Sequence, residues 1–569
     1  MDFLIKLNKK HIKDIEYLYI NDLATITFNT EKLYIEKLPH LDYKVLDGEK
    51  QVFLLGDIIA YDEKDEENNK GFFYRIVWDK NYHKLEFYSD YSNFLPIYYC
   101  ELEDLYIISS SIHTLNMLIK SYYLKPNPLF ITQIAMLNAP FKEECFLKII
   151  KKLNYGSYLL IDDEGLQCIQ SKQFYDLLTD RPRSYKKALN DIVDLFIKEC
   201  SKYLDKPAYI SLTGGFDGRA ITSIAHYYEN DFKTYSYGKS ENYDVYIPLQ
   251  IANKLGFDHT VIYLDDNYVK NYYEYFVNQF LKFSGGMNGF LYPTFLYTSY
   301  YLSKNNRPLV TGFVGSELLR NAHCAGAITS QFILDLLKKD KDYAINNYIS
   351  NPNLSIFGDN LDTNAIIETA ESVSYYFNCL PEELSLNQKL AVFEFEEIIP
   401  KHFGISVYAG LHYNRVRSPF IDTSFLISIS KTQISQFYRK FLEQNPLKRF
   451  WGQYFYAVII DRTWPQLGKE ISAKQYAPAD LLSFSGRLRI LKGYYKKEQQ
   501  KKNANFDNLS LISGMQSYIS KNKSLSKYMN LNNNIISQLS RNENKRDYLL
   551  LLLSYIQYQK VLNNITQSL

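Results

Sequence analysis

From about residue 185 the chain alternates short apolar strands with amphipathic helices, and this alternation constrains the fold more than any other feature. Strands are expected at PAYISL (207–212), FKTYSYG (232–238) and HTVIYL (259–264), and helices at 217–228 and 246–255. Strands that alternate with helices predict a parallel sheet covered on both faces. Later in the chain, the pattern becomes almost entirely helical.

The first 175 residues or so have a different pattern, typical of antiparallel strands. Short runs rich in β-branched and aromatic residues are separated by turn-forming residues. The expected fold class is therefore α+β: an N-terminal antiparallel β-sandwich, then an α/β parallel-sheet domain with a mainly helical C-terminal part. We place the domains at 1–178, 179–480 and 481–569, the last a helical extension in which Leu549 to Leu553 predict a buried helix.

Charge and cysteine content narrow the function classes. The chain has 65 Lys and Arg against 63 Asp and Glu, so its formal net charge is only +2. Without a basic field we expect no nucleic-acid partner. The chain has no run of 18 apolar residues and its start does not resemble a signal peptide, so we expect no membrane partner and a cytoplasmic location. The six cysteines form no CxxC pair, which argues against structural zinc and disulfides.

The most informative segment is YISLTGGFDGR (209–219), in which a strand ends in a hydroxyl residue and two glycines before a helix begins. Glycines let the backbone approach phosphate oxygens, and the free N–H groups of a helix N-terminus attract anions. Asp217, in the first helical turn, is placed to hold Mg²⁺ through its carboxylate. The alternative is a tight strand-to-helix turn in which Asp217 serves only as a cap.

This segment resembles the SGGxDS pyrophosphate-binding loop of asparagine synthetases and their relatives, the ATP-pyrophosphatase family. The resemblance implies ATP as nucleotide and Asp217 as the Mg²⁺ ligand. The last Ser of the family pattern is Gly218 here, which removes one hydroxyl contact to pyrophosphate. The phosphate-binding residues that the resemblance implies are Thr213, Gly214, Gly215, Asp217, Gly218 and Arg219.

Two later segments follow in the family's order. Residues 234–260 are similar to the second strand-and-helix unit, which implies that backbone groups near Ser236 and Gly238 contact the adenine. LVTGFVGSELLR (309–320) resembles the SGxGxDE loop and retains Gly312, Gly315 and Glu317.

This second loop also departs from the family. Ser316 replaces an Asp that serves as a second magnesium ligand in the family. Phe313 stands where β-lactam synthetases have a catalytic Tyr, so β-lactam closure is not expected. VRSPFID (416–422) resembles the VRxPFLD signature, for which we favour an architectural role over catalysis.

The resemblance implies that Lys474 and Glu317 are catalytic. WPQLGKEISAKQYAPAD (464–480) lies where the family has a Lys that stabilises charge during adenylation, and Lys474 is the better match, with Lys469 as the alternative. SGGMNGFLYPT (284–294) is expected either to line the substrate pocket or to be a plain connector.

The N-terminal domain resembles a degraded glutamine amidotransferase domain. GFFYRIVWD (71–79) is similar to the family's GxFAxxIWD, and SDYSNFLPIYY (89–99) to its RDxxGxxPLYY. Leu55 and Ala60 replace two asparagines of the glutamine site. The family nucleophile is an N-terminal Cys, whereas the first cysteine here is Cys100, so we expect no glutamine hydrolysis.

Together these motifs predict an ATP-dependent ligase that forms amide bonds. A small-molecule or peptide carboxylate would be activated as an acyl-adenylate with release of pyrophosphate, and ammonia or an amine would then displace AMP. A homodimer is compatible with this interpretation. The alternative is a nucleotide-binding pseudoenzyme that scaffolds a biosynthetic complex. Sulfur transfer to tRNA is disfavoured because reactive cysteine pairs and a basic face are missing.

Overall fold

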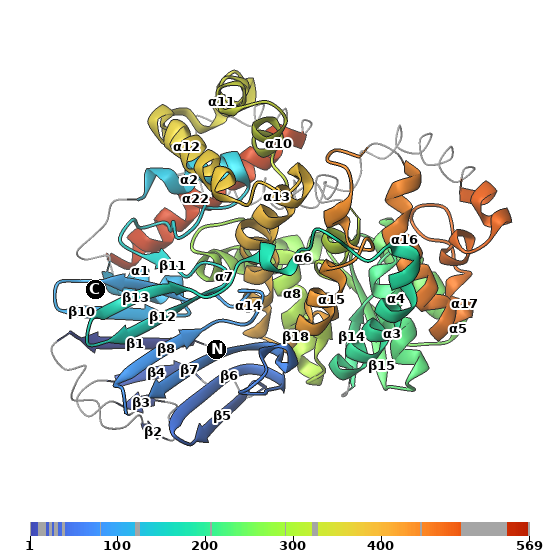
Figure 1. Cartoon of the computed structure of the whole chain (residues 1–569), viewed down its shortest axis with the longest axis horizontal. Coiled ribbons are helices and arrows are strands. Elements are labelled where there is room, and N and C mark those ends of the chain that lie inside the picture. The colour runs from blue at the N-terminus through green and yellow to red at the C-terminus, as the bar shows by residue number, and fades with distance from the viewer. Residues whose placement is uncertain are drawn as a thin grey trace.

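In a computed structural model, antiparallel sheets lie at one end of the molecule and a helix-covered parallel sheet at the other (Figure 1). The pairing of the strands confirms the expected order of an antiparallel N-terminal region and a parallel sheet. The structure describes residues 2–9, 19–21, 25–27, 32–36, 40–79, 81–119, 126–204, 207–290, 292–320, 328–443, 446–490 and 543–566.

Two antiparallel sheets build the N-terminal region within these residues. The seven-stranded sheet has the order β11-β9-β10-β1-β4-β3-β2 and the six-stranded sheet β13-β12-β8-β7-β6-β5. Their inner faces meet where the Phe3 ring packs edge-on against Tyr74, with ring centroids 5.1 Å apart. The strands are β1 (Asp2–Asn8), β2 (Tyr19–Asn21), β3 (Thr25–Thr27), β4 (Lys32–Glu36), β5 (Asp42–Asp47), β6 (Lys50–Ala60), β7 (Lys70–Asp79), β8 (Lys84–Tyr88), β9 (Tyr98–Glu101), β10 (Leu105–Ser109), β11 (Lys151–Lys152), β12 (Ser157–Asp162) and β13 (Gly165–Gln170).

The parallel sheet has the order β16-β15-β14-β17-β18, so the direction in which the chain adds strands reverses between β14 and β17. In open α/β sheets, such a reversal opens a crevice beyond the carboxyl ends of the strands. The strands are β14 (Ala208–Ser211), β15 (Phe232–Gly238), β16 (His259–Tyr263), β17 (Leu309–Val310) and β18 (Val416–Arg417).

Helices connect and cover these strands (Figure 1). The N-terminal region carries α1 (Ile112–Ile119), α2 (Pro128–Leu137) and the 3₁₀ turns η2 (Glu66–Asn68) and η3 (Phe174–Leu177). Around the parallel sheet lie α3 (Tyr185–Tyr203), α4 (Asp217–Tyr227), α5 (Tyr243–Leu255), α6 (Asp266–Asn271), α7 (Tyr273–Ser284), α8 (Pro293–Leu302), η4 (Ser303–Asn305) and α9 (Gly315–Leu319). Further along the chain come α10 (Gln331–Lys338), α11 (Lys341–Ile349), η6 (Pro352–Asn360), α12 (Thr363–Cys379), α13 (Leu386–Phe393), the π-helical η7 (Glu394–Ile398) and η8 (Pro400–Gly404), α14 (Ile405–Leu411), η9 (Pro419–Ile421), α15 (Thr423–Ser430), η10 (Gln436–Tyr438), α16 (Pro446–Thr463), α17 (Pro465–Gly468) and η11 (Pro478–Leu481).

The last described helix, α22 (Glu543–Thr566), returns to the N-terminal half of the chain. Its Leu549 to Leu553 are buried, as their apolar run predicts. The Tyr558 hydroxyl accepts a hydrogen bond from the Asn116 side chain in α1 at 2.6 Å. Much of the remaining C-terminal extension, residues 491–542, lies outside the described residues.

A buried ion pair joins the antiparallel region to the parallel sheet. Arg417, at the end of β18, donates from Nε to Asp57 Oδ2 at 2.6 Å and from Nη2 to Asp57 Oδ1 at 3.0 Å. Both side chains are at most 1% exposed. Arg417 Nη1 also donates to the Tyr203 carbonyl at 3.0 Å, so the guanidinium is bound on several sides.

A second buried cluster lies along the same boundary. Lys70 Nζ lies 2.6 Å from Asp422 Oδ2 and 2.7 Å from Glu199 Oε2. The Tyr203 hydroxyl donates to the same Asp422 oxygen at 3.1 Å. Residues that resemble the VRxPFLD signature therefore hold the two regions together, which favours the architectural role expected for them.

Removing the charge of Asp57 should destabilise the whole molecule. Asp57→Asn leaves Arg417 buried with no compensating carboxylate on this side, and breaking one partner of a buried pair typically costs about 3–5 kcal/mol. We expect a loss of that size in urea denaturation. Asp194→Asn is the matched control, because its pair with Arg462 is exposed and exposed pairs contribute about 1 kcal/mol or less. Equal effects of the two substitutions would contradict the anchoring role.

Candidate functional site

The predicted phosphate loop lies at the carboxyl edge of the parallel sheet, where the strand order reverses. It connects β14 to α4, and the loop after β17 approaches it from the other side of the reversal. A Cβ on Gly312 would lie 2.9 Å from the Asp217 Cβ, so glycine at 312 allows the two loops to meet. The structure thus brings together two motifs that are about 100 residues apart in the sequence.

Gly218 has a packing role in the same turn. A Cβ at this position would lie 2.0 Å from the carbonyl oxygen of Ser211. Helix α4 therefore begins directly against the end of β14, as in turns that present helix N–H groups to an anion. Position 218 thus has a local steric reason to be glycine, whereas the motif that this loop resembles has serine there.

A cavity of about 240 Å³ opens beside this loop at the ends of β14, β15 and β16. Thr213, Ser236 and Gly238, all predicted nucleotide-binding residues, line it. The Ser236 hydroxyl forms a hydrogen bond with Nε2 of His259 at 2.9 Å. Burial lowers the pKa of His259 to about 4. This imidazole is therefore neutral at physiological pH.

Asp244 also lines the cavity and binds the glycine loop directly. Its Oδ1 accepts a hydrogen bond from the Gly214 N–H at 2.9 Å. The Gly214 N–H thus donates to a carboxylate oxygen, and a phosphate oxygen would be a similar anionic acceptor. A phosphate at this N–H would have to displace the Asp244 carboxylate.

Asp217 receives a hydrogen bond from Ser316, which stands where the motif that this loop resembles has an acidic residue. Ser316 Oγ donates to Asp217 Oδ2 at 2.9 Å. Neighbouring Glu317 is only 8% exposed. Burial, with a further contribution from the charge of Asp217, raises the pKa of Glu317 to about 7. The two predicted residues Asp217 and Glu317 therefore lie close together, with Ser316 beside them.

Asp217 and Glu317 fit a Mg²⁺ ion that is shared with substrate phosphates. The described residues contain no group of three or more His, Cys, Asp or Glu side chains that could hold a metal by themselves. Mg²⁺, however, usually takes one or two carboxylates together with substrate phosphates and water. Asp217 beside the glycine loop, with Glu317 next to it, suits that shared form of coordination.

Glu394 is a further residue of this region that the sequence interpretation missed. It accepts a hydrogen bond from the Thr329 hydroxyl, and burial raises its pKa to about 8, with the charge of Glu317 adding to the shift. Glu394 is the first residue of the π-helical η7. Single π-helical turns often occur at functional sites. In the sequence, Glu394 could have been noticed because acidic residues interrupt the apolar run FEFEEII (393–399).

Lys474 reaches the glycine loop from the C-terminal end of the domain. The Ala473 N–H donates to the Gly214 carbonyl at 3.0 Å, and Lys474 Nζ lies 5.1 Å from the centre of the Phe216 ring. Lys469, the alternative, is exposed at the end of α17. The geometry therefore favours Lys474 over Lys469 as the lysine of the site.

Arg219 supports this loop with its side chain. Its guanidinium is fully buried and donates to the carbonyls of Glu470 and Ile471 at 2.7 and 3.0 Å. Burial lowers its pKa to about 10. These bonds direct the Arg219 guanidinium toward the segment that carries Lys474.

The segment expected to line a substrate pocket lies mostly elsewhere. Gly286 lies against the Tyr558 ring, and the Phe290 N–H donates to Ser554 Oγ at 3.3 Å. Gly286 and Phe290 thus contact α22, and among the described residues of 284–294 only Thr294 lines the 240 Å³ cavity.

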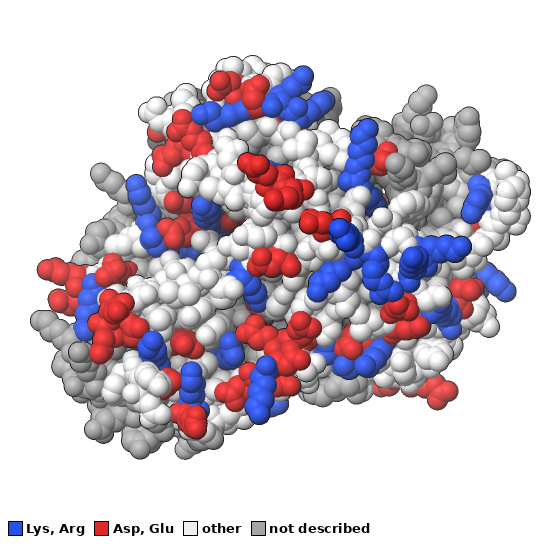
Figure 2. Space-filling model, in the orientation of Figure 1, with Lys and Arg blue, Asp and Glu red and all other residues white. Residues whose placement is uncertain are grey.

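Comparisons with models of protein families and with characterised proteins gave no match to this chain. Charged side chains of both signs are interspersed over the face shown in Figure 2. Within the described residues, no helix is both long enough and apolar enough to span a membrane.

The raised pKa of Glu394 predicts a specific pH dependence of stability. An unfolded Glu394 ionises near its ordinary pKa of 4.5, whereas the folded protein keeps the proton until about pH 8. Stability should therefore fall between these values, by at most about 1.4 kcal/mol per pH unit for one proton. In thermal unfolding from pH 5 to 8, Glu394→Gln should lose less stability than the unmodified protein.

The exposed Glu382 provides the matched control for this experiment. Glu382→Gln should follow the pH profile of the unmodified protein. Parallel profiles for Glu394→Gln and the unmodified protein would show that Glu394 ionises normally in the folded state.

Proposed function

We propose that this protein is an ATP-dependent ligase that activates a carboxylate by adenylation and passes it to ammonia or an amine. The observation that carries the proposal is the meeting of the glycine loop, Asp217 and Gly312 at the strand-order reversal of a parallel sheet. Ligands of open α/β sheets bind at such a reversal. The sequence resemblance to the ATP-pyrophosphatase family supplies the reaction type.

In this proposal each residue has a defined task. The 213–218 loop and the N-terminus of α4 bind the pyrophosphate part of ATP, and Asp217 with Glu317 hold Mg²⁺, which would offset the charge of the leaving pyrophosphate. Ser236 and Gly238 line the adenine side of the cavity. Lys474 lies beside the loop and would stabilise negative charge on the reacting phosphate.

Ammonia or an amine enters this scheme without a glutaminase step. The N-terminal domain is proposed to act as a scaffold, because Leu55 and Ala60 stand where the family has asparagines of its glutamine site. Its interdomain ion pairs support this role, since they tie the domain to the edge of the parallel sheet.

Two contacts favour a second candidate, a nucleotide-binding pseudoenzyme that acts as a scaffold. Ser316 stands in place of an acidic ligand and donates to Asp217, and Asp244 already accepts the Gly214 N–H. Hydroxylamine trapping separates the two functions without knowledge of the amine. With Mg-ATP and a panel of carboxylates, a ligase yields a hydroxamate and pyrophosphate, whereas a pseudoenzyme binds ATP and yields neither.

Asp217→Asn should weaken binding of Mg-ATP at least about tenfold, because charged interactions of this kind typically contribute about 1.5–3 kcal/mol. Isothermal titration with and without Mg²⁺ measures the loss, which should be smaller without the ion. The control is Asp342→Asn, an exposed carboxylate in the first turn of α11. Unchanged affinity in Asp217→Asn would remove Asp217 from the metal site.

Lys474→Ala should retain ATP binding, because the glycine loop is unaltered, but should lower pyrophosphate formation about a hundredfold or more. Removing one preorganised donor from a developing charge typically costs about 10² to 10³ in rate. Lys474→Arg should recover little, since a planar guanidinium does not replace a compact ammonium. Lys469→Ala is the control and should leave the rate of pyrophosphate formation nearly unchanged. The opposite result, with only Lys469→Ala inactive, would show that Lys469 is the lysine of the site.

A further inference from the structure

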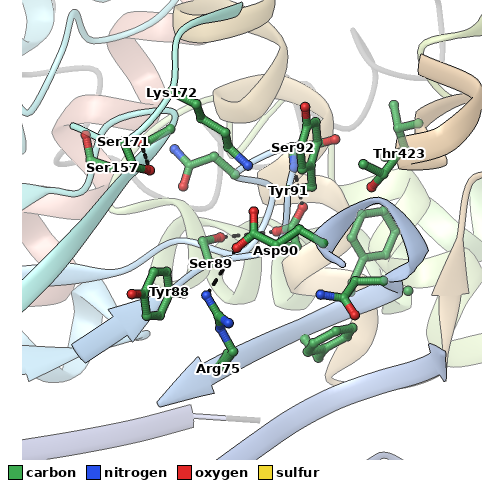
Figure 3. Close-up of a pocket in the computed structure, with 18 of the residues that line it drawn as sticks. Arg75, Tyr88, Ser89, Asp90, Tyr91, Ser92, Ser157, Ser171, Lys172 and Thr423 are labelled. Atoms are coloured by element: carbon green, nitrogen blue, oxygen red, sulfur yellow. Dashed lines mark hydrogen bonds and ion pairs between the residues drawn. The ribbon is translucent and has the colours of Figure 1, made fainter. Parts of the chain in front are cut away.

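A second cavity, of about 90 Å³, lies in the N-terminal region and is separate from the proposed nucleotide site (Figure 3). Its walls come from β7, β8 and the turn after β8, from residues 156–157 and 171–172, and from the segment after β18. Side chains alternate along a strand, so Arg75 of β7 points away from the sandwich core that contains Tyr74. The cavity is lined by Phe72 of the core as well as by Arg75, and thus lies at the edge of the sandwich, against the second domain.

Lys172 is the distinctive group of this cavity. Its ammonium lies 3.5 Å from the centre of the Tyr91 ring, and burial lowers its pKa to about 8. Among the residues that the structure describes, none forms an ion pair or hydrogen bond with this ammonium. The Lys172 side chain is half-buried, and an aromatic face replaces only part of the hydration that a cation loses in such a place. The ammonium therefore favours an acceptor inside the cavity.

The carboxylates around the cavity are already bound by other donors. Glu66 Oε1 accepts from Arg75 Nη2 at 3.2 Å. Asp90 Oδ1 accepts from the Ser92 N–H at 3.1 Å, and its Oδ2 accepts from the Leu95 N–H at 2.8 Å. Asp90 thus organises the turn in which it lies. Because Glu66 and Asp90 are bound by these donors, Lys172 has no oxygen partner among the described residues that line the cavity.

Two buried residues with hydroxyl side chains, Ser92 and Thr423, also line the cavity. Neither hydroxyl hydrogen-bonds to another side chain or backbone group within the described part of the chain. In Figure 3, Lys172 lies at the top of the view, Thr423 at the right and Arg75 at the bottom. Cation and hydroxyl donors therefore border one cavity from different sides.

We propose that this cavity is a binding site for a small monoanionic carboxylate, with Lys172 as the cation and Ser92 and Thr423 as hydroxyl donors. A water molecule takes up about 30 Å³ of liquid, so the cavity has room for a molecule the size of acetate or propionate. A dianion such as phosphate fits less well, because Glu66 and Asp90 would repel its second charge.

The site joins the two domains. Thr423 follows Asp422, which binds Lys70 across the domain boundary, and Ser418 at the cavity wall donates to the carbonyl of Phe313 at 2.9 Å. Phe313 belongs to the loop that carries Gly312. A carboxylate in the cavity would therefore contact both domains and stabilise their packing, since a ligand that binds only the folded protein raises its stability.

Titration of the full chain with ¹³C-labelled acetate, followed by NMR line broadening and by the thermal midpoint, tests this site. We expect saturable binding and a rising midpoint in the unmodified protein. Lys172→Met keeps the apolar stem against Tyr91 but removes the charge, and should weaken acetate binding at least about tenfold, the typical loss for a charged hydrogen bond. Lys84→Met is the matched control, because Lys84 of β8 is 42% exposed and lies outside the cavity wall.

Thr423→Val provides a second variant that removes only a hydroxyl, and it should weaken acetate binding severalfold even if Lys172→Met fails to fold. Phosphate in place of acetate tests the ligand class. Tighter binding of phosphate than of acetate would overturn the carboxylate assignment. Acetate binding that is equal in the unmodified protein and in the variants that fold would overturn the site itself. None of these outcomes depends on ligase activity.

Discussion

The buried pair of Arg417 and Asp57 is the interaction on which the arrangement of the two domains depends. Neither side chain has access to water, so each charge depends on a compensating partner, and Arg415 Nε lies 3.8 Å from Asp57 Oδ1 as a second cation. Arg417 ends β18, at the edge of the parallel sheet, and Asp57 lies in β6 of the antiparallel region. Loss of either partner would leave a buried charge at the centre of the interface.

The same boundary connects the two candidate binding regions. Ser418, next to Arg417, binds the carbonyl of Phe313 in the loop that meets Asp217. On the other side, Asp422 binds Lys70, and Thr423 lines the smaller cavity. The antiparallel region thus contributes buried ion-pair partners, Asp57 and Lys70, to residues at the edge of the parallel sheet.

The local geometry of the glycine turn at the candidate site was largely predictable because its components are close together in the sequence. The turn from β14 to α4 contains its glycines, its hydroxyl residue and Asp217 within a few consecutive residues, and each has a steric or electrostatic reason at that position. Glu394 was not predictable in this way. Its burial beside Glu317 depends on a π-helical segment that follows α13 and on the approach of Thr329.

By itself, the sequence determined the antiparallel and parallel sheets, their order along the chain and the glycine turn at the candidate site, because periodicity and turn chemistry act between near neighbours. The tertiary structure decided the roles that depend on distant partners. Arg219 supports the Lys474 segment because it meets the carbonyls of residues 470 and 471, and Gly286 and Phe290 contact α22, more than 250 residues later. Such contacts leave no periodic signal, since the packing of separate elements creates them.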